Sequence, residues 1–143
     1  MRILALDIGE KRCGIAVSDA AQKIAFPIST LSTQEVMDNH PSFKRILEDY
    51  EPELLLCGLP VSLDGTEHSQ AKRIRTQAQH ISEQTEIPLA FTDERLSSAQ
   101  ARRALKEAGQ NERLMRGKID MVAASLFLQS YLDCATLTAR KEV

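Results

Sequence analysis

The stretch MRILALDIGEKRCGIAVSD, residues 1–19, decides the fold. Residues 2–8 are a nearly continuous apolar run that ends in Asp7-Ile8-Gly9, which is typical of a strand buried on both faces. The run GIAVS over 14–18 predicts a second short strand. Because residues 9–13 are too few for a helix, we expect the two strands to pair as an antiparallel hairpin.

The rest of the chain extends this hairpin into an α/β fold. Further strands are predicted over residues 24–31, 54–57 and 88–92, and helices after Pro41 within 32–50, over 66–85, from a Ser97–Gln100 capping box to Gly109, and from 118 to about 135. Three strands that can form a meander are followed by strand–helix alternation. This order indicates a five-stranded mixed sheet, an antiparallel meander of strands 1–3 plus two parallel strands, flanked by helices. We expect a single domain over residues 1–143.

The helices differ in how much of their surface is apolar. The helix over 66–85 is amphipathic, and we expect Ala71, Ile74, Ala78 and Ile81 to face the core. The last helix is apolar on most of its circumference, so we expect it to be well buried.

Composition excludes several classes of protein. A net charge of −2 argues against a general polyanion-coating protein, and the absence of Trp disfavours a reader of single strands that stacks several bases. Cys13, Cys57 and Cys134 form no CxxC pair, so we expect buried reduced thiols rather than a zinc site or a disulfide framework. The N-terminal apolar run meets Asp7 too early for a signal peptide, and no 18-residue apolar stretch exists. We therefore expect a soluble cytoplasmic protein with no membrane association.

Carboxylates at three distant places are candidates for chemistry. Asp7 closes a buried strand, where an unpartnered charge is costly, although a turn aspartate that accepts backbone hydrogen bonds is an equally good interpretation. Asp120 lies in the first turn of an apolar helix. One interpretation is an ordinary first-turn acid that interacts with the helix dipole, and the other is a residue that faces a cleft. Asp93 and Glu94 end the last strand and would point to opposite faces, so at most one can look toward Asp7.

Such carboxylates can converge, because an open α/β sheet forms its site at the carboxyl ends of its strands. Hard divalent cations such as Mg²⁺ prefer oxygen ligands, and two of them can promote phosphoryl transfer. Basic residues gather around the same elements: residues 95–118 hold seven, including Arg102 and Arg103, against two acids, and Lys11-Arg12 follow Asp7. This placement suits a phosphate backbone, although each cluster is also compatible with an ordinary solvated face.

Four blocks of the sequence carry a resemblance to a known family. They are DIGEKRCGIAVSD at 7–19, GLP at 58–60 with DGTE at 64–67, DERLS at 93–97, and KIDMVAA at 118–124. Together they resemble the bacterial family described both as Holliday junction resolvases and as pre-16S ribosomal RNA nucleases. The blocks span nearly the whole chain in the family's order.

The resemblance implies an RNase H-like fold and a nuclease dependent on Mg²⁺ or Mn²⁺ that matures the 5′ end of 16S rRNA or resolves DNA junctions. It implies Asp7, Glu94 and Asp120 as catalytic metal ligands, with Asp93 as the fallback for Glu94. The residues expected to contact nucleic acid, from the resemblance and the charge clusters, are Lys11, Arg12, Arg95, Arg102, Arg103 and Lys118. Pre-rRNA is the favoured partner and branched DNA the second, and both a monomer and a homodimer are compatible.

Three alternative functions fit parts of this pattern. An ATPase or sugar-kinase half domain also carries an Asp-x-Gly hairpin, but such enzymes close two domains over the nucleotide. A non-catalytic RNA-binding module would share the basic clusters. A resolvase acting on DNA would share the carboxylates, since no element that reads bases distinguishes RNA from DNA in this sequence.

Overall fold

The computed structural model describes residues 1–60, 69–93, 103, 107 and 118–141. Its five strands are β1 (Ile3–Ile8), β2 (Arg12–Ser18), β3 (Ala25–Ser32), β4 (Leu54–Leu59) and β5 (Leu89–Asp93). They form one sheet in the order β3-β2-β1-β4-β5. β1, β2 and β3 pair antiparallel, whereas β4 pairs parallel with β1 and β5 pairs parallel with β4. The predicted mixed sheet is confirmed.

The helices are α1 (Thr33–Met37), α2 (Pro41–Tyr50), α3 (Ser69–Thr85) and α6 (Ile119–Lys141). α2 begins at the predicted proline, and the four predicted core residues of α3 are all buried. α6 continues to Lys141, beyond the predicted end near 135, because helical backbone can propagate past the last apolar contact with the sheet. The predicted capping box at Ser97 lies outside the described residues.

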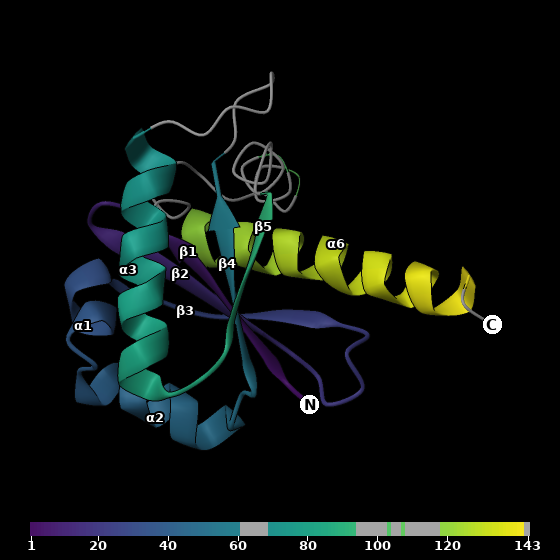
Figure 1. Cartoon of the computed structure of the whole chain (residues 1–143), viewed down its shortest axis with the longest axis horizontal. Helices are drawn as coiled ribbons and strands as arrows, with labels where there is room; N and C mark the ends of the chain where they lie inside the picture. Colours follow the sequence, from purple (N-terminus) through teal and green to yellow (C-terminus); the bar gives the residue numbers. More distant parts are fainter. Residues whose placement is uncertain (61–68, 94–102, 104–106, 108–117, 142–143) are drawn as a thin grey trace.

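The sheet is buried on both faces, which explains the apolar character of β1. Leu4, Leu6 and Ile8 belong to a larger core beneath α1, α2 and α3, whereas Ile3 and Ala5 belong to a smaller core beneath α6. Figure 1 shows α6 crossing the sheet on the side away from α3 and running on past the sheet toward the C-terminus. Successive residues of β1 therefore meet different layers of helices.

The prediction that the cysteines and the last helix are buried holds only in part. Cys13 and Cys57 lie in the larger core, but Cys134 is exposed, so its predicted burial is wrong. α6 buries one face, with Phe127 and Leu128 at its centre, while its opposite side faces solvent around Ser130 and Asp133. Small alanines let α6 pack closely on the sheet along one face, and the rest of its circumference is left uncovered. Within the described part of the chain, no helix is both long and apolar enough to cross a membrane.

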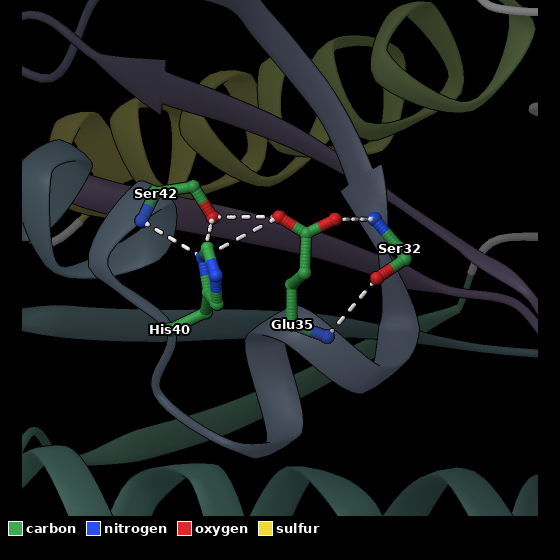
Figure 2. Close-up of polar contacts among 4 residues, drawn as sticks. All are labelled: Ser32, Glu35, His40 and Ser42. Atoms are coloured by element: carbon green, nitrogen blue, oxygen red, sulfur yellow. Dashed lines mark hydrogen bonds and ion pairs between the residues drawn. The ribbon is translucent and has the colours of Figure 1, made fainter.

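A polar network joins β3, α1 and α2 (Figure 2). Ser32 caps α1 by accepting a hydrogen bond from the Glu35 amide at 3.1 Å, and the Glu35 carboxylate accepts one from the Ser32 amide at 3.4 Å. The same carboxylate accepts a hydrogen bond from the Ser42 hydroxyl at 2.8 Å and lies 3.6 Å from Nδ1 of His40. This capping box was missed from the sequence, although the S-x-x-E spacing at Ser32 is its usual signature.

The network predicts a pH-dependent contribution to stability. The hydrogen bond from Ser42, followed by those from Ser32, lowers the pKa of Glu35 below its ordinary value of 4.5. The stabilisation is therefore fully present above the unfolded-state pKa and is lost as the pH falls through the lower folded-state pKa. The urea midpoint of Glu35→Gln should be below that of the wild type at pH 7, and the gap should close as the pH falls below 4.5.

Glu48→Gln, on the exposed side of α2, is the matched control and should leave the midpoint unchanged at both pH values. A midpoint gap for Glu35→Gln that stays constant with pH would contradict the assignment.

Candidate active site

Asp7 lies at the carboxyl end of β1 and faces α6. Its partner in the β1–β2 pairing is Gly14, and directly opposed residues of an antiparallel pair project to the same face. Asp7 also follows Ile3 and Ala5 in alternation, and those two residues pack against α6. The half-buried Asp7 carboxylate is therefore placed on the α6 side of the sheet.

Gly14 lets the backbone of α6 approach the sheet at this point. A Cβ atom built on Gly14 would overlap the carbonyl carbon and oxygen of Asp120 and crowd the amide of Met121. Only a glycine leaves room for this contact. Since Gly14 is paired with Asp7, the contact brings the first turn of α6, and with it Asp120, to the rim where β1 ends.

The carboxylate of Asp120 is partly desolvated. Its side chain is 24% exposed, and its Oδ2 atom lies 3.1 Å from Nε of Arg12. The guanidinium of Arg12 gives this buried oxygen an ion pair and at most a poorly aligned hydrogen bond within the described residues. Burial raises the pKa of Asp120, and the charge of Arg12 opposes that shift. An additional cation would satisfy this oxygen.

The thiol of Cys13 is a neutral neighbour of this rim. Burial, and then the charges of Cys57, Asp7 and Asp120, raise the pKa of Cys13 well above its ordinary value. The two aspartates thus act electrostatically on the same buried side chain. Its side chain lies in the larger core, on the face of the sheet opposite Asp7, where a nucleophile would not reach a ligand at the rim.

A pocket of about 400 Å³ opens beside Asp120 and the β1–β2 turn. It is lined by Gly9, Glu10, Lys11, Arg12 and Asp120. The turn is tight: the Gly9 amide donates to the Arg12 carbonyl at 2.8 Å, and a Cβ at Gly9 would lie 2.7 Å from that oxygen. Two basic side chains beside a partly buried carboxylate suit an anionic ligand that arrives together with a cation.

The other predicted site residues either lie away from the Asp7–Asp120 rim, line no part of its pocket, or fall outside the described residues. Asp93 is exposed at the end of β5 and pairs with Leu59, which belongs to the larger core, so it lies on the face opposite Asp7. Arg103 is exposed and Lys118 is half-buried in the turn before α6. Glu94, Arg95 and Arg102 lie outside the described residues. Within the described ranges no three His, Cys, Asp or Glu side chains form a cluster able to hold a metal. Asp7 and Asp120 come to one rim, and the exposed Glu10 lines the pocket beside it.

Two features of the site were missed from the sequence. Gly14 was treated only as the first residue of a strand, although a glycine inside a strand often marks a close approach of another backbone. Arg12 was predicted to contact nucleic acid, but its ion pair with Asp120 depends on a contact between distant parts of the chain.

Comparison with known proteins shows the family of the chain. A family model described as "RuvX: Holliday junction resolvase" matches residues 1–134. The chain belongs to this family. Among relatives of the RuvX family, the "Putative pre-16S rRNA nuclease" of Methylobacillus flagellatus is 36% identical over 131 residues, covering 92% of this chain and 90% of the relative. The protein of the same name from Nitrosospira multiformis is 39% identical over 130 residues, covering 91% and 86%.

Solved structures of resolvases share the fold of this RuvX chain. Thermus thermophilus RuvC superposes with a TM-score of 0.53 at 13% identity, covering 95% of this chain and 96% of that one. The Fowlpox virus resolvase, solved with Holliday junction DNA, gives 0.54 at 15% identity, covering 94% and 99%. The expected RNase H-like fold is confirmed.

The contact at Gly14 can be tested by adding one methyl group. Gly14→Ala should lower the free energy of unfolding by about 1–3 kcal/mol, because the new Cβ meets backbone rather than a side chain that can turn away. Urea denaturation followed by circular dichroism measures the loss. Ala16→Gly, two residues along the same strand and face, is the control and removes a methyl group instead. A smaller loss for Gly14→Ala than for this control would show that α6 does not rest on Gly14.

Proposed function

We propose that this chain is a nuclease that hydrolyses phosphodiester bonds of structured nucleic acid, at the 5′ end of pre-16S rRNA during ribosome biogenesis. The observation that carries the proposal is the contact between β2 and α6 at Gly14, the residue that pairs with Asp7 of β1, in a member of the RuvX family. This contact brings Asp7 and Asp120 to one rim. The names of its relatives support the substrate.

Divalent metal ions fit the residues of this rim. Asp7 and Asp120 would hold Mg²⁺ or Mn²⁺ through carboxylate oxygens, and the ion would join Arg12 as a positive neighbour of the buried Oδ2 of Asp120. When bound, these ions activate water and stabilise the charge that develops on the phosphate. Glu94 is the third ligand in this proposal. Asp93 faces the other side of the sheet, and the next residue of an extended chain would face Asp7.

The basic residues bind and orient the phosphate backbone in this proposal. Lys11 and Arg12 line the pocket beside Asp120, where they can attract a phosphate to the carboxylate rim. Arg12 also neutralises Asp120 before substrate binds, which limits repulsion between the acidic rim and the nucleic acid. Arg95, Arg102, Arg103 and Lys118 are proposed to extend this contact.

Branched DNA is the second candidate substrate. The name of the matching family model and the likeness to a resolvase solved with junction DNA favour it. The active unit is proposed to be the single domain of residues 1–143, as a monomer or a homodimer, acting in the cytoplasm where rRNA matures.

The catalytic role of Asp7 gives the most direct functional prediction. Asp7→Asn should reduce cleavage of a precursor 16S rRNA fragment in Mg²⁺ or Mn²⁺ by at least about a hundredfold, because the amide cannot supply the anionic oxygen that the metals require. Thermal unfolding should change little. The rates are measured on denaturing gels under single-turnover conditions.

The same assay should include a four-way DNA junction and a control variant, Asp49→Asn, on the exposed side of α2. The control should cleave like the wild type. Faster cleavage of the DNA junction than of the rRNA fragment would identify branched DNA as the preferred substrate. A fully active Asp7→Asn protein would contradict the proposed role of Asp7 as a metal ligand.

A further inference from the structure

Thr33, the first residue of α1, holds the turn that borders the proposed site. It is 5% exposed. Its hydroxyl donates a hydrogen bond to the Gly9 carbonyl at 2.7 Å, and its amide donates one to the Lys11 carbonyl at 2.9 Å. Thr33 thus satisfies two carbonyls of the β1–β2 turn, one through its hydroxyl and one through its backbone amide.

These two hydrogen bonds determine how the turn presents its side chains. Peptide planarity couples each carbonyl to the following N–H, so fixing the carbonyls of Gly9 and Lys11 also fixes the amides of Glu10 and Arg12. Gly9 alone would allow many turn conformations, because glycine has the widest backbone freedom. When both carbonyls are hydrogen-bonded, the backbone of Lys11 and Arg12 has one defined conformation, and this limits where their side chains can lie in the pocket.

Thr33 is itself held in place by its neighbours. The preceding residue, Ser32, pairs with Arg12 in the sheet and caps α1. Glu35 closes the capping box and accepts the Ser42 hydroxyl, which ties α1 to the start of α2 (Figure 2). Thr33 therefore connects the turn to the hydrogen-bonded network that joins β3, α1 and α2.

The polar cluster in Figure 2 is not a second catalytic centre. A hydrolytic triad needs a histidine that contacts the nucleophile and the carboxylate through different ring nitrogens. Here Nδ1 of His40 lies 2.9 Å from the Ser42 hydroxyl and 3.6 Å from the Glu35 carboxylate, so one nitrogen faces both groups. The arrangement suits a structural role, in which Ser32 and Glu35 cap α1 and the Ser42 hydroxyl links α2 to Glu35.

We propose that Thr33 is a positioning residue for phosphate binding: its hydroxyl sets the conformation of the Gly9–Arg12 turn, and so the placement of Lys11 and Arg12 beside Asp120. This inference rests on the proposed nuclease function and adds a residue that touches neither metal nor substrate. It acts through the turn backbone.

Thr33→Val removes the hydroxyl and keeps the shape of the side chain. It should raise KM for the nucleic acid by about tenfold with kcat within about twofold, because the turn loses its hydrogen bond but the carboxylates stay in place. Thr33→Ser should restore most of the loss. In a Lys11→Ala background, Thr33→Val should raise KM by less than it does alone, since the two changes act on one contact.

Amide hydrogen exchange tests the positioning role without any assay of cleavage. In Thr33→Val the amides of Gly9 and Thr33 should exchange at least about tenfold faster, while that of Leu56 in the centre of the sheet stays unchanged. Thr85→Val, which removes a hydroxyl-to-carbonyl hydrogen bond at the end of α3, is the matched control and should alter neither exchange at the turn nor KM.

Different outcomes separate the two proposals. A wild-type chain that neither binds nor cleaves nucleic acid would overturn the proposed function, and exchange at the turn would still decide whether Thr33 holds it. Unchanged exchange at Gly9, a Thr33→Ser protein as impaired as Thr33→Val, or strictly additive effects with Lys11→Ala would each overturn the role of Thr33.

Discussion

The backbone contact between α6 and Gly14 is the constraint on which the proposed site depends. A strand end and a helix start, more than a hundred residues apart in the chain, meet there because one position in β2 has no side chain. The contact sets the position of Asp120 beside the end of β1. It also brings Asp120 within reach of Arg12, so the charge balance of the rim follows from the same packing.

The two-sided burial of the sheet explains why a carboxylate can be kept in this position. β1 is covered by α1–α3 on one face and by α6 on the other, and it could not hold Asp7 at mid-strand without a large desolvation cost. At the carboxyl end of the strand the carboxylate stays half-buried beside a solvent-facing pocket. The adjacent turn supplies basic side chains, and Thr33 holds that turn from the far side of β2.

Local patterns in the sequence predicted much of the fold. The hairpin around Asp7, the start of α2 at Pro41 and the buried face of α3 depend on neighbouring residues, which a local pattern can reveal. The fit of α6 onto Gly14 and the pairing of Arg12 with Asp120 depend on tertiary packing, which periodicity does not encode. The exposure of the last cysteine likewise follows from which face of α6 meets the sheet.

The most direct test of the account is where a divalent ion binds. Substoichiometric Mn²⁺ added to isotopically labelled protein broadens the amide resonances nearest to the bound ion. The account predicts broadening first at Ile8, Gly9, Gly14 and Met121, which lie in the β1–β2 hairpin and the first turn of α6, and its loss in Asp7→Asn. Broadening confined to other acidic surfaces, such as the exposed side of α2, or unchanged by Asp7→Asn, would contradict the claim that this contact assembles the metal-binding site.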